Sequence, residues 1–409
     1  MSDKSILILT QYYPPEVGAP QNRLHELAVR LQAKGIKVDV LTAMPNYPKM
    51  VIDEAYRNGK IKEEIIDGVQ VYRSKIFVSN SKKIIPRLLN YFSFVWTSYW
   101  RGRKLGKYDF LMVESPPLFL GYSAMRLSKK LNAKLIFNVS DLWPESAEKM
   151  GIVSNQQMLR MAYKLEEKCY KRSSLVTGQT MGIVNNIKER FPNTQVHWLP
   201  NGVDLDFYDP KKIAKNDFRL RNNIHESDIV FFYGGIIGHA QGLETVLRAA
   251  KLLESESNVK IVLQGAGPEK EYLQKLNSEL GLSNVLFLPP VQKSEMPSIL
   301  AEVDVALVPL RKLDLFQGAI PSKIFEALAM QKALLLGVDG EAKIHFIDKA
   351  KAGYFFEPEN SNDLAEKMRL MAKEPNQITE MGVAARAYVT EHFNRNNIAN
   401  DFIAVLNNN

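Results

Sequence analysis

The strongest constraint on the fold of this chain is an alternation of short apolar runs with longer amphipathic segments, almost from end to end. The short runs are typical of buried strands, and the segments between them place apolar residues at helical spacing. This order favours α/β structure with parallel sheets. We expect strands in the first half at residues 5–10, 37–42, 69–77, 110–114, 134–139, 175–179 and 196–199, and in the second half at 229–233, 260–263, 285–288, 305–308 and 333–337.

Length and composition are compatible with two such sheets. The 409 residues suffice for two domains of ordinary size, and 45% hydrophobic with 24% charged residues is typical of a globular protein. The single cysteine, Cys169, excludes an internal disulfide and favours a reducing compartment. The N-terminal apolar run is too short for a signal peptide, and no uncharged run approaches the ~20 residues of a membrane span. We therefore expect a cytoplasmic protein.

The stretch 309–330, PLRKLDLFQGAIPSKIFEALAM, predicts a strand end, a polar loop and a helix that has Ser322 as its N-cap. A helix N-terminus after a strand presents N–H groups and a positive dipole end to an anion. Lys323 lies in the first turn, where a cation is poorly placed unless a phosphate fills the site. Glu326 follows one turn later and can accept hydrogen bonds from hydroxyls. The alternative is a solvated surface Lys and Glu.

Two further glycine turns follow predicted strands. Residues 234–242 read GGIIGHAQG, and residues 265–268 read GAGP, with Pro268 at the expected N1 position of a helix. Together with Ser322 they would place three helix N-termini on one edge of one sheet, which predicts a diphosphate cradle. His239 is expected to be structural or to contact a hydroxyl, because the sequence indicates no partner that would make it a base.

In the first half, two polar positions also follow predicted strands. The loop 11–21, QYYPPEVGAPQ, lacks a dinucleotide fingerprint, but Gly18 allows close backbone approach just before a helix. Asp141 ends a strand in NVSDLWPES, where it can meet a sugar hydroxyl while Trp143 offers an apolar face to a ring. Ligands bind beyond the carboxyl ends of parallel strands. The alternatives are an ordinary connection at Gly18 and an N-cap at Asp141 for the helix that Pro144 begins.

Residues 82–107 carry seven of the eight net positive charges and no acidic residue. The basic residues are Lys82, Lys83, Arg87, Arg101, Arg103, Lys104 and Lys107, and the aromatic ones are Tyr91, Phe92, Phe94, Trp96, Tyr99 and Trp100. Basic flanks around an aromatic centre predict a helix that lies on an anionic membrane surface. A core helix with solvated basic ends is the alternative. We expect no nucleic-acid binding, because no nucleic-acid motif accompanies the charge.

Over essentially its whole length the chain resembles the family-4 retaining glycosyltransferases of the GT-B type. The matching pieces are YPPEVGAPQNRLHELAVRL, NGVD at 201–204, the GAGP turn, VDVALVPL and PSKIFEALA. The segments VSDLWPES and GGIIGHAQGLE are similar to the bacterial surface-polysaccharide branch, which includes enzymes that transfer N-acetylated amino sugars such as N-acetylfucosamine.

The resemblance implies two Rossmann-like domains with parallel sheets that face an interdomain cleft. We expect an acceptor-binding domain at 1–200, joined by a C-terminal helix at about 390–409, and a nucleotide-sugar-binding domain at 201–389. Residues 205–216 are expected to be the linker. Asp204 and Asp206 form a D-x-D pattern there, which we reject as a metal site because no His lies nearby.

The resemblance also implies a site. Glu326 matches the second glutamate of the family's paired motif, the ribose contact, whereas Gly318 stands where the first should be. Ile236 and Gln241 stand where an Arg and a Lys are usual, so Lys323 gains importance. Catalytic roles are expected for Lys323, Asp141 and His239. Donor-binding residues are expected to be Gly235, Gly238, Gln241, Gly265, Gly267, Val291, Ser322, Lys323 and Glu326, with Gly18.

The implied activity is transfer of a sugar from a UDP-sugar to a polyprenyl-diphosphate-linked glycan of O-antigen or capsule, at the inner face of the cell membrane. The anomeric configuration is kept, no metal or other cofactor is needed, and the leaving phosphate can itself deprotonate the acceptor. Two alternatives stay open: a GT-B sugar-nucleotide epimerase, which also releases UDP but needs no lipid, and a non-catalytic nucleotide-sugar sensor.

Overall fold

A computed structural model describes residues 4–16, 18–47, 50–81, 84–214 and 217–409. The chain forms two compact units, one of Met1–Asn201 with Ile398–Asn409 and the other of Gly202–Asn397. Residues 205–214, expected as a linker, therefore belong to the second unit. There Arg386 of α14 (Pro375–His392) donates a hydrogen bond to the carbonyl of Tyr208, so this segment contacts α14.

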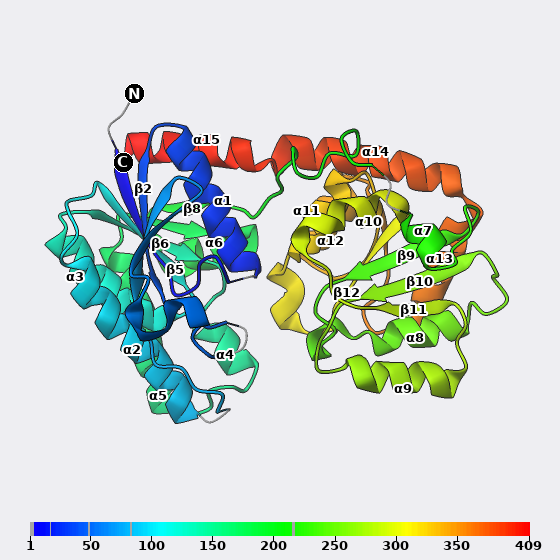
Figure 1. The fold of residues 1–409 in the computed structure, drawn as a ribbon, viewed down its shortest axis with the longest axis horizontal. Coiled ribbons are helices and arrows are strands. Elements are labelled where there is room, and N and C mark those ends of the chain that lie inside the picture. The colour runs from blue at the N-terminus through cyan, green and yellow to red at the C-terminus, as the bar shows by residue number, and fades with distance from the viewer. Residues whose placement is uncertain (1–3, 17, 48–49, 82–83, 215–216) are drawn as a thin grey trace. The chain divides into compact units, whose positions relative to one another are not determined.

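The first unit is built on an eight-stranded sheet of order β3-β4-β2-β1-β5-β6-β7-β8 (Figure 1). The strands are β1 (Ser5–Leu9), β2 (Lys37–Ala43), β3 (Glu63–Ile66), β4 (Val69–Ser74), β5 (Phe110–Ser115), β6 (Lys134–Val139), β7 (Leu175–Gly178) and β8 (Val196–Trp198). All neighbouring pairs are parallel except β3 with β4. The sequence prediction missed β3, although Asp67 and Gly68, both with positive φ, form the two-residue turn typical of a hairpin.

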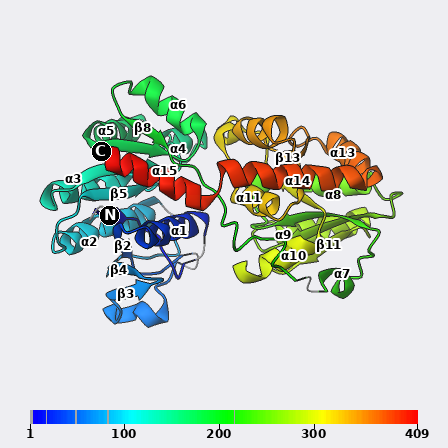
Figure 2. The same cartoon turned by 90° about the horizontal axis from the view of Figure 1, so that it is seen from above.

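Helices cover both faces of this sheet because its strands alternate their apolar side chains. Ile6 and Ile8 of β1 belong to an apolar cluster with α1 (Ala19–Ala33) and the C-terminal α15 (Arg395–Asn408). Leu7 and Leu9 belong to a second cluster on the opposite face. The helices that contribute to it are α2 (Ile84–Gly102), α3 (Gly121–Lys130), α5 (Gln156–Arg172) and α6 (Met181–Arg190). Figure 2 shows α15 and α1 from above.

The second unit holds a six-stranded sheet of order β11-β10-β9-β12-β13-β14 in which all neighbouring pairs are parallel. The strands are β9 (Ile229–Gly234), β10 (Val259–Gln264), β11 (Val285–Leu288), β12 (Val305–Pro309), β13 (Ala333–Gly337) and β14 (Gly353–Phe355). Five of these were predicted; β14 has only three residues and gives no strand pattern.

Helices α8 (Glu244–Lys251) and α9 (Lys270–Leu280) lie on one face of this sheet, and α10 (Met296–Glu302) and α11 (Ser322–Ala329) lie on the other (Figure 1). After β14 the chain is helical, in α13 (Ser361–Lys373), α14 (Pro375–His392) and α15, as the sequence predicted. The shorter helices are α4 (Glu145–Lys149), α7 (Phe218–Arg221) and α12 (Glu341–Lys343). The prediction of two α/β domains with parallel sheets is confirmed.

Candidate active site

The two glycine turns of the second unit are joined by their backbones. They follow the neighbouring strands β9 and β10, and the N–H of Gly235 donates to the carbonyl of Gln264 at 2.9 Å. A Cβ on Gly265 would lie 1.8 Å from the Gly235 carbonyl oxygen, and one on Gly267 would lie 2.2 Å from that of Ile237. The predicted juxtaposition is therefore present, and the second turn needs its glycines in order to pack against the first.

Lys323 brings the third element to these turns. Its Nζ lies 3.7 Å from the centre of the Tyr233 ring and 2.9 Å from the point where a Cβ of Gly235 would stand. The Tyr233 hydroxyl in turn donates to the carbonyl of Ile236 at 2.5 Å. The ammonium group thus lies against the first glycine turn, at the start of α11.

The ammonium of Lys323 is only weakly compensated by neighbouring charge. Burial lowers the pKa of its ammonium to about 7, and Glu326 only partly opposes the effect. Apart from the Tyr233 ring, no hydrogen bond or ion pair of this ammonium is present in the part of the chain that the structure describes. A cation held in this way is stabilised when an anion binds, because the desolvation that lowers its pKa is then offset by an opposite charge.

Glu326 lines the same small cavity of about 30 Å³ as Lys323. A water needs roughly 10–15 Å³ of such space, so the cavity is large enough for water. Burial raises the pKa of Glu326, while the charges of Lys293 and Arg395 and the hydroxyl of Tyr208 oppose this shift. One turn of α11 separates the two side chains, as predicted, and both reach one cavity.

Two predicted helix starts are wrong. The N-cap position of α11 is held by Pro321, which makes no side-chain cap, and Ser322 is the first residue of the helix. The fixed φ of proline suits this position, and the chain enters the helix directly from it. Helix α9 begins at Lys270, so Pro268 lies in the turn before the helix and not at N1.

His239 has a partner that the sequence did not indicate. Its Nδ1 lies 2.9 Å from Oε1 of Glu269, and 71% of the His239 side chain is exposed. His239 and Gln241 belong to the 3-10 helix η3 (His239–Gln241), whose N-cap is Gly238. A Cβ on Gly238 would lie 3.3 Å from Oε1 of Gln241, so this glycine leaves room for the amide.

The remaining predicted contacts lie at carboxyl edges. Val291 is half-buried in the loop after β11. In the first unit, Gly18 is the N-cap of α1 with an extended backbone, and a Cβ there would lie 2.4 Å from Oε1 of Gln21. Gln21 is 3% exposed, and its Oε1 has no hydrogen-bond partner among the residues that the structure describes.

Asp141 lies two residues beyond β6 and accepts a hydrogen bond from the Ser146 hydroxyl at 2.5 Å. Burial raises the pKa of this carboxyl group, against the hydrogen bonds from Ser146 and from the Leu142 backbone. It does not cap α4, whose N-cap position is held by Pro144, so the alternative interpretation of Asp141 is wrong. A carboxylate at a carboxyl edge can accept hydrogen bonds from hydroxyls.

The sequence did not indicate a buried ion pair that lies next to Asp141. Arg23 of α1 and Glu114 of β5 pair at 2.9 Å, with 6% and 5% of their side chains exposed. Arg23 also donates to the Ser140 hydroxyl at 2.8 Å, one residue before Asp141. A Glu at the end of an apolar strand was the available signal. The pair fixes the backbone from which Asp141 projects.

The sequence also did not indicate two cations near the glycine turns of the second unit. Arg311 follows β12, and its backbone N–H donates to the Ala240 carbonyl at 3.0 Å. Its side-chain Nε is buried and unpartnered within the described ranges. Lys270 donates from Nζ to the carbonyls of Gly265 at 2.9 Å and Leu288 at 3.0 Å, which holds the second glycine turn. Arg311 comes just after a strand and Lys270 is the first residue of a helix, and those positions were the available signals.

Helix α2 shows one buried and one exposed face. Asn90, Phe94 and Ser98 are buried. The opposite face, called here the α2 stripe, is formed by Ile85, Leu89, Phe92, Trp96 and Trp100, which are 66%, 52%, 43%, 65% and 42% exposed. Helix α2 therefore packs one face on the core and exposes large apolar side chains on the other, as well as having solvated ends.

The charges around the α2 stripe are partly engaged. Arg101 pairs with Glu63, and the Arg103 guanidinium lies 4.3 Å from the centre of the Trp100 ring. Lys82 and Lys83 lie outside the described residues. No helix in the described ranges has the length and apolar character needed to cross a membrane.

The D-x-D pattern is occupied by local contacts. Oδ1 of Asp204 accepts from the backbone N–H of Asp206 at 2.9 Å and of Phe207 at 3.1 Å, and Asp206 pairs with Lys212 at 3.1 Å. Among the described residues, no three His, Cys, Asp or Glu side chains are grouped so as to hold a metal ion.

Comparisons with known proteins agree with this architecture. Residues 21–207 match the family model of Glycosyltransferase Family 4, and residues 214–388 match that of Glycosyl transferases group 1. The protein named as colanic acid biosynthesis glycosyl transferase WcaI of Escherichia coli K12 is 25% identical over 97% of this chain and 98% of its own.

Solved structures show the same fold. Sucrose-phosphate synthase of Thermosynechococcus elongatus superposes with a TM-score of 0.74 at 17% identity, over 99% of this chain and 98% of its own. Anabaena HepE, in complex with UDP and glucose, gives 0.72 at 16% identity, over 99% of this chain and 100% of its own. The two matched models and the fold identify a glycosyltransferase of the GT-B class.

Proposed function

We propose that the protein is a retaining, metal-independent glycosyltransferase of bacterial polysaccharide synthesis. It moves a sugar, an N-acetylated amino sugar in our proposal, from a UDP-sugar to a polyprenyl-diphosphate-linked glycan of O-antigen or capsule. The observation that carries the proposal is the half-buried ammonium of Lys323, which makes no ion pair within the described residues and lies against two joined glycine turns. The similarity to WcaI supports the pathway, and the UDP complex of HepE supports the donor class.

The second unit provides what the leaving group requires. As the bond between the sugar C1 and the diphosphate oxygen breaks, negative charge grows on the diphosphate and the sugar becomes oxocarbenium-like. Preorganised N–H dipoles and an ammonium stabilise that charge without reorganisation. Lys323 supplies the ammonium. The other backbone N–H groups of the two turns supply the dipoles, because those of Gly235 and Gly265 already donate to the carbonyls of Gln264 and Leu288. Glu326 accepts hydrogen bonds from the ribose hydroxyls.

The proton balance needs no dedicated protein base. The acceptor oxygen forms its bond to C1 on the face that the diphosphate leaves, so the anomeric configuration is kept. The acceptor hydroxyl proton passes to the departing phosphate oxygen. Asp141, held beside the pair of Arg23 and Glu114, orients an acceptor hydroxyl, and His239 with Glu269 contacts a hydroxyl of the donor sugar.

The α2 stripe supports peripheral association with the inner face of the cell membrane. Its five large apolar side chains are exposed on one side of an amphipathic helix, which is the arrangement of helices that lie in the membrane interface. Basic residues near an anionic surface add about 1 kcal/mol each. Arg103, Lys104 and Lys107 are exposed near the C-terminal end of the stripe and supply this attraction.

The test is incubation of the whole protein with a panel of UDP-sugars and a polyprenyl-diphosphate-linked sugar, followed by NMR of the product. We expect transfer with retained configuration, unchanged by EDTA. Release of UDP without any acceptor would favour an epimerase instead. Donor binding without UDP release would favour a sensor, and activity lost in EDTA and restored by manganese would refute metal independence.

A further inference from the structure

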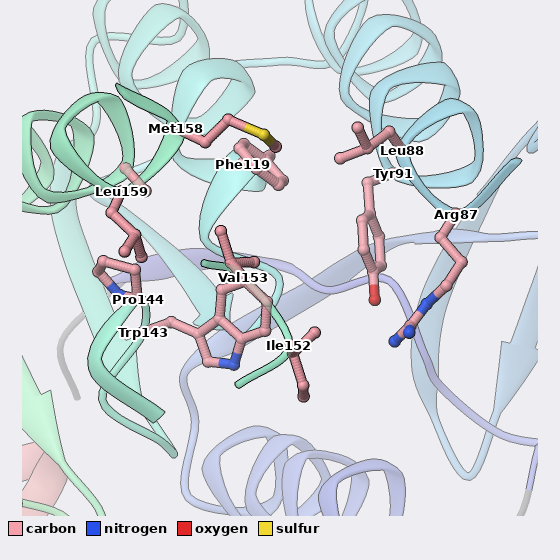
Figure 3. Close-up of a pocket in the computed structure, with 11 residues that line it drawn as sticks. Arg87, Leu88, Tyr91, Phe119, Trp143, Pro144, Ile152, Val153, Met158 and Leu159 are labelled. Atoms are coloured by element: carbon pink, nitrogen blue, oxygen red, sulfur yellow. The ribbon is translucent and has the colours of Figure 1, made fainter. Parts of the chain in front are cut away.

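An apolar pocket in the first unit takes no part in the site described above. It has a volume of about 210 Å³ and lies among α2, the short helix η2 (Leu118–Leu120), the loop after β6 and α5 (Figure 3). Its lining residues include Trp143, Val153 and Ala162, and Arg87 is the one charged residue among those that line it. Pockets for drug-sized ligands hold roughly 300–1,000 Å³, so this one fits a short apolar segment rather than a nucleotide-sugar.

The pocket has a polar side. In Figure 3 the Arg87 guanidinium and the Tyr91 hydroxyl lie together at one side of the apolar lining. Tyr12, in the loop after β1, is near both: burial raises its pKa, Tyr91 adds to the effect and the charge of Arg87 opposes it. Gln11 donates to the Tyr12 hydroxyl at 3.2 Å. An exposed cation beside an apolar pocket is complementary to a ligand with an anionic head and an apolar chain.

The pocket lies close in sequence to the residue that we assign to the acceptor. Trp143 follows Asp141 by two residues, so the wall of the pocket continues from the carboxylate that we assign to an acceptor hydroxyl. On α2, Phe92 of the α2 stripe packs against Phe119 of the pocket lining, with ring centres 4.9 Å apart, so this wall continues into the surface that we assign to the membrane. A ligand here reaches from the bilayer to the sugar.

We propose that this pocket binds the isoprenyl units next to the diphosphate of the lipid-linked acceptor, and that Arg87 pairs with that diphosphate. The inference rests on the proposed function and names the acceptor's lipid subsite. A phospholipid is the less suitable occupant, because its head group stays at the bilayer surface and has no reason to extend along the loop that carries Asp141.

Binding of geranylgeranyl diphosphate to the purified whole protein, measured by calorimetry in detergent, tests the proposal without requiring turnover. Ala162→Phe fills the pocket and should weaken binding at least tenfold, and Val153→Phe serves as a second filling variant. Ala33→Phe, at an exposed position in α1, is the matched control and should bind like the unaltered protein. Arg87→Ala should weaken binding of the diphosphate about tenfold but leave binding of geranylgeraniol unchanged.

The outcomes separate the possibilities. Unchanged binding in both folded filling variants overturns the site. Equal competition by phosphatidic acid in the same detergent assigns the pocket to a phospholipid and overturns the acceptor assignment. If Arg87→Ala weakens binding of geranylgeraniol as much as binding of geranylgeranyl diphosphate, Arg87 does not pair with the diphosphate. If prenyl binding depends on the pocket but no UDP-sugar reacts, the proposed transfer fails while the lipid subsite stands.

Discussion

Donor binding should take up a proton at Lys323. Burial holds the pKa of this ammonium at about 7 in the free protein, so near pH 7 about half of the molecules carry a neutral amine. A bound diphosphate favours the charged form and raises the pKa again. The charged form, and with it the full donor affinity, is therefore present below pH 7 and is lost as the pH rises through 7.

The size of the effect follows from this pKa. If donor binds only the charged form, the apparent dissociation constant grows by about tenfold between pH 6 and pH 8, and about half a proton is taken up for each donor bound at pH 7. A UDP-sugar is the suitable probe, because each of its phosphates carries one ester and one anhydride bond and therefore has no ionisation in this range. Calorimetry in buffers of different ionisation enthalpy measures the proton and the affinity together.

Two variants isolate the ammonium. Lys323→Arg carries a charge at every pH in this range, so its donor affinity should not change between pH 6 and pH 8. Lys323→Met should bind more weakly and also without pH dependence, and it should lose about a hundredfold in turnover, as removal of a preorganised charge stabiliser typically does. A flat profile in the unaltered protein, or a slope that survives in Lys323→Met, refutes the reasoning.

Three further changes test the other parts of the site. Glu326→Ala should raise the dissociation constant for UDP about tenfold through loss of charge-assisted hydrogen bonds to the ribose, but leave that for uracil unchanged; equal losses for both would contradict it. Asp141→Asn should lower transfer at least tenfold while UDP affinity, measured by calorimetry, stays within twofold; loss of UDP binding in a folded variant would place Asp141 elsewhere. Leu89→Ser with Trp96→Ser should reduce flotation with anionic liposomes by roughly tenfold or more, because each large apolar side chain contributes about 1.5–3 kcal/mol when buried; undiminished flotation would exclude the α2 stripe.

The sequence predicted the sheets well because buried parallel strands are continuous apolar runs with turns at both ends. Strands β6, β11 and β13 have the bounds expected for them. It failed at β3, where Glu63 and Glu64 belong to an edge strand that needs no apolar pattern, and at β14, which is too short for one. Strand periodicity reports burial, and a short or edge strand is only partly buried.

The site was predicted less completely, for a different reason. Glycine turns and a helix start are local patterns, so the meeting of Gly235, Gly265 and Lys323 could be expected from strand order. The partner of His239 is Glu269, thirty residues later, and that of Arg23 is Glu114, ninety-one residues later. Such pairs depend on which elements become neighbours in the fold, which no local pattern specifies.

The departures from the family pattern at Ile236 and Gln241 are consistent with this dependence on tertiary neighbours. The first glycine turn lacks these two cations, but other cations lie near the same edge of the sheet. One follows the end of β12 and the other is at the start of α9. Arg311 hydrogen-bonds through its backbone to Ala240 of that turn, and Lys270 holds the carbonyl of Gly265 in the turn packed against it. The positive charge is thus supplied by neighbouring elements, and the turn itself is free to place its glycine backbone against Lys323.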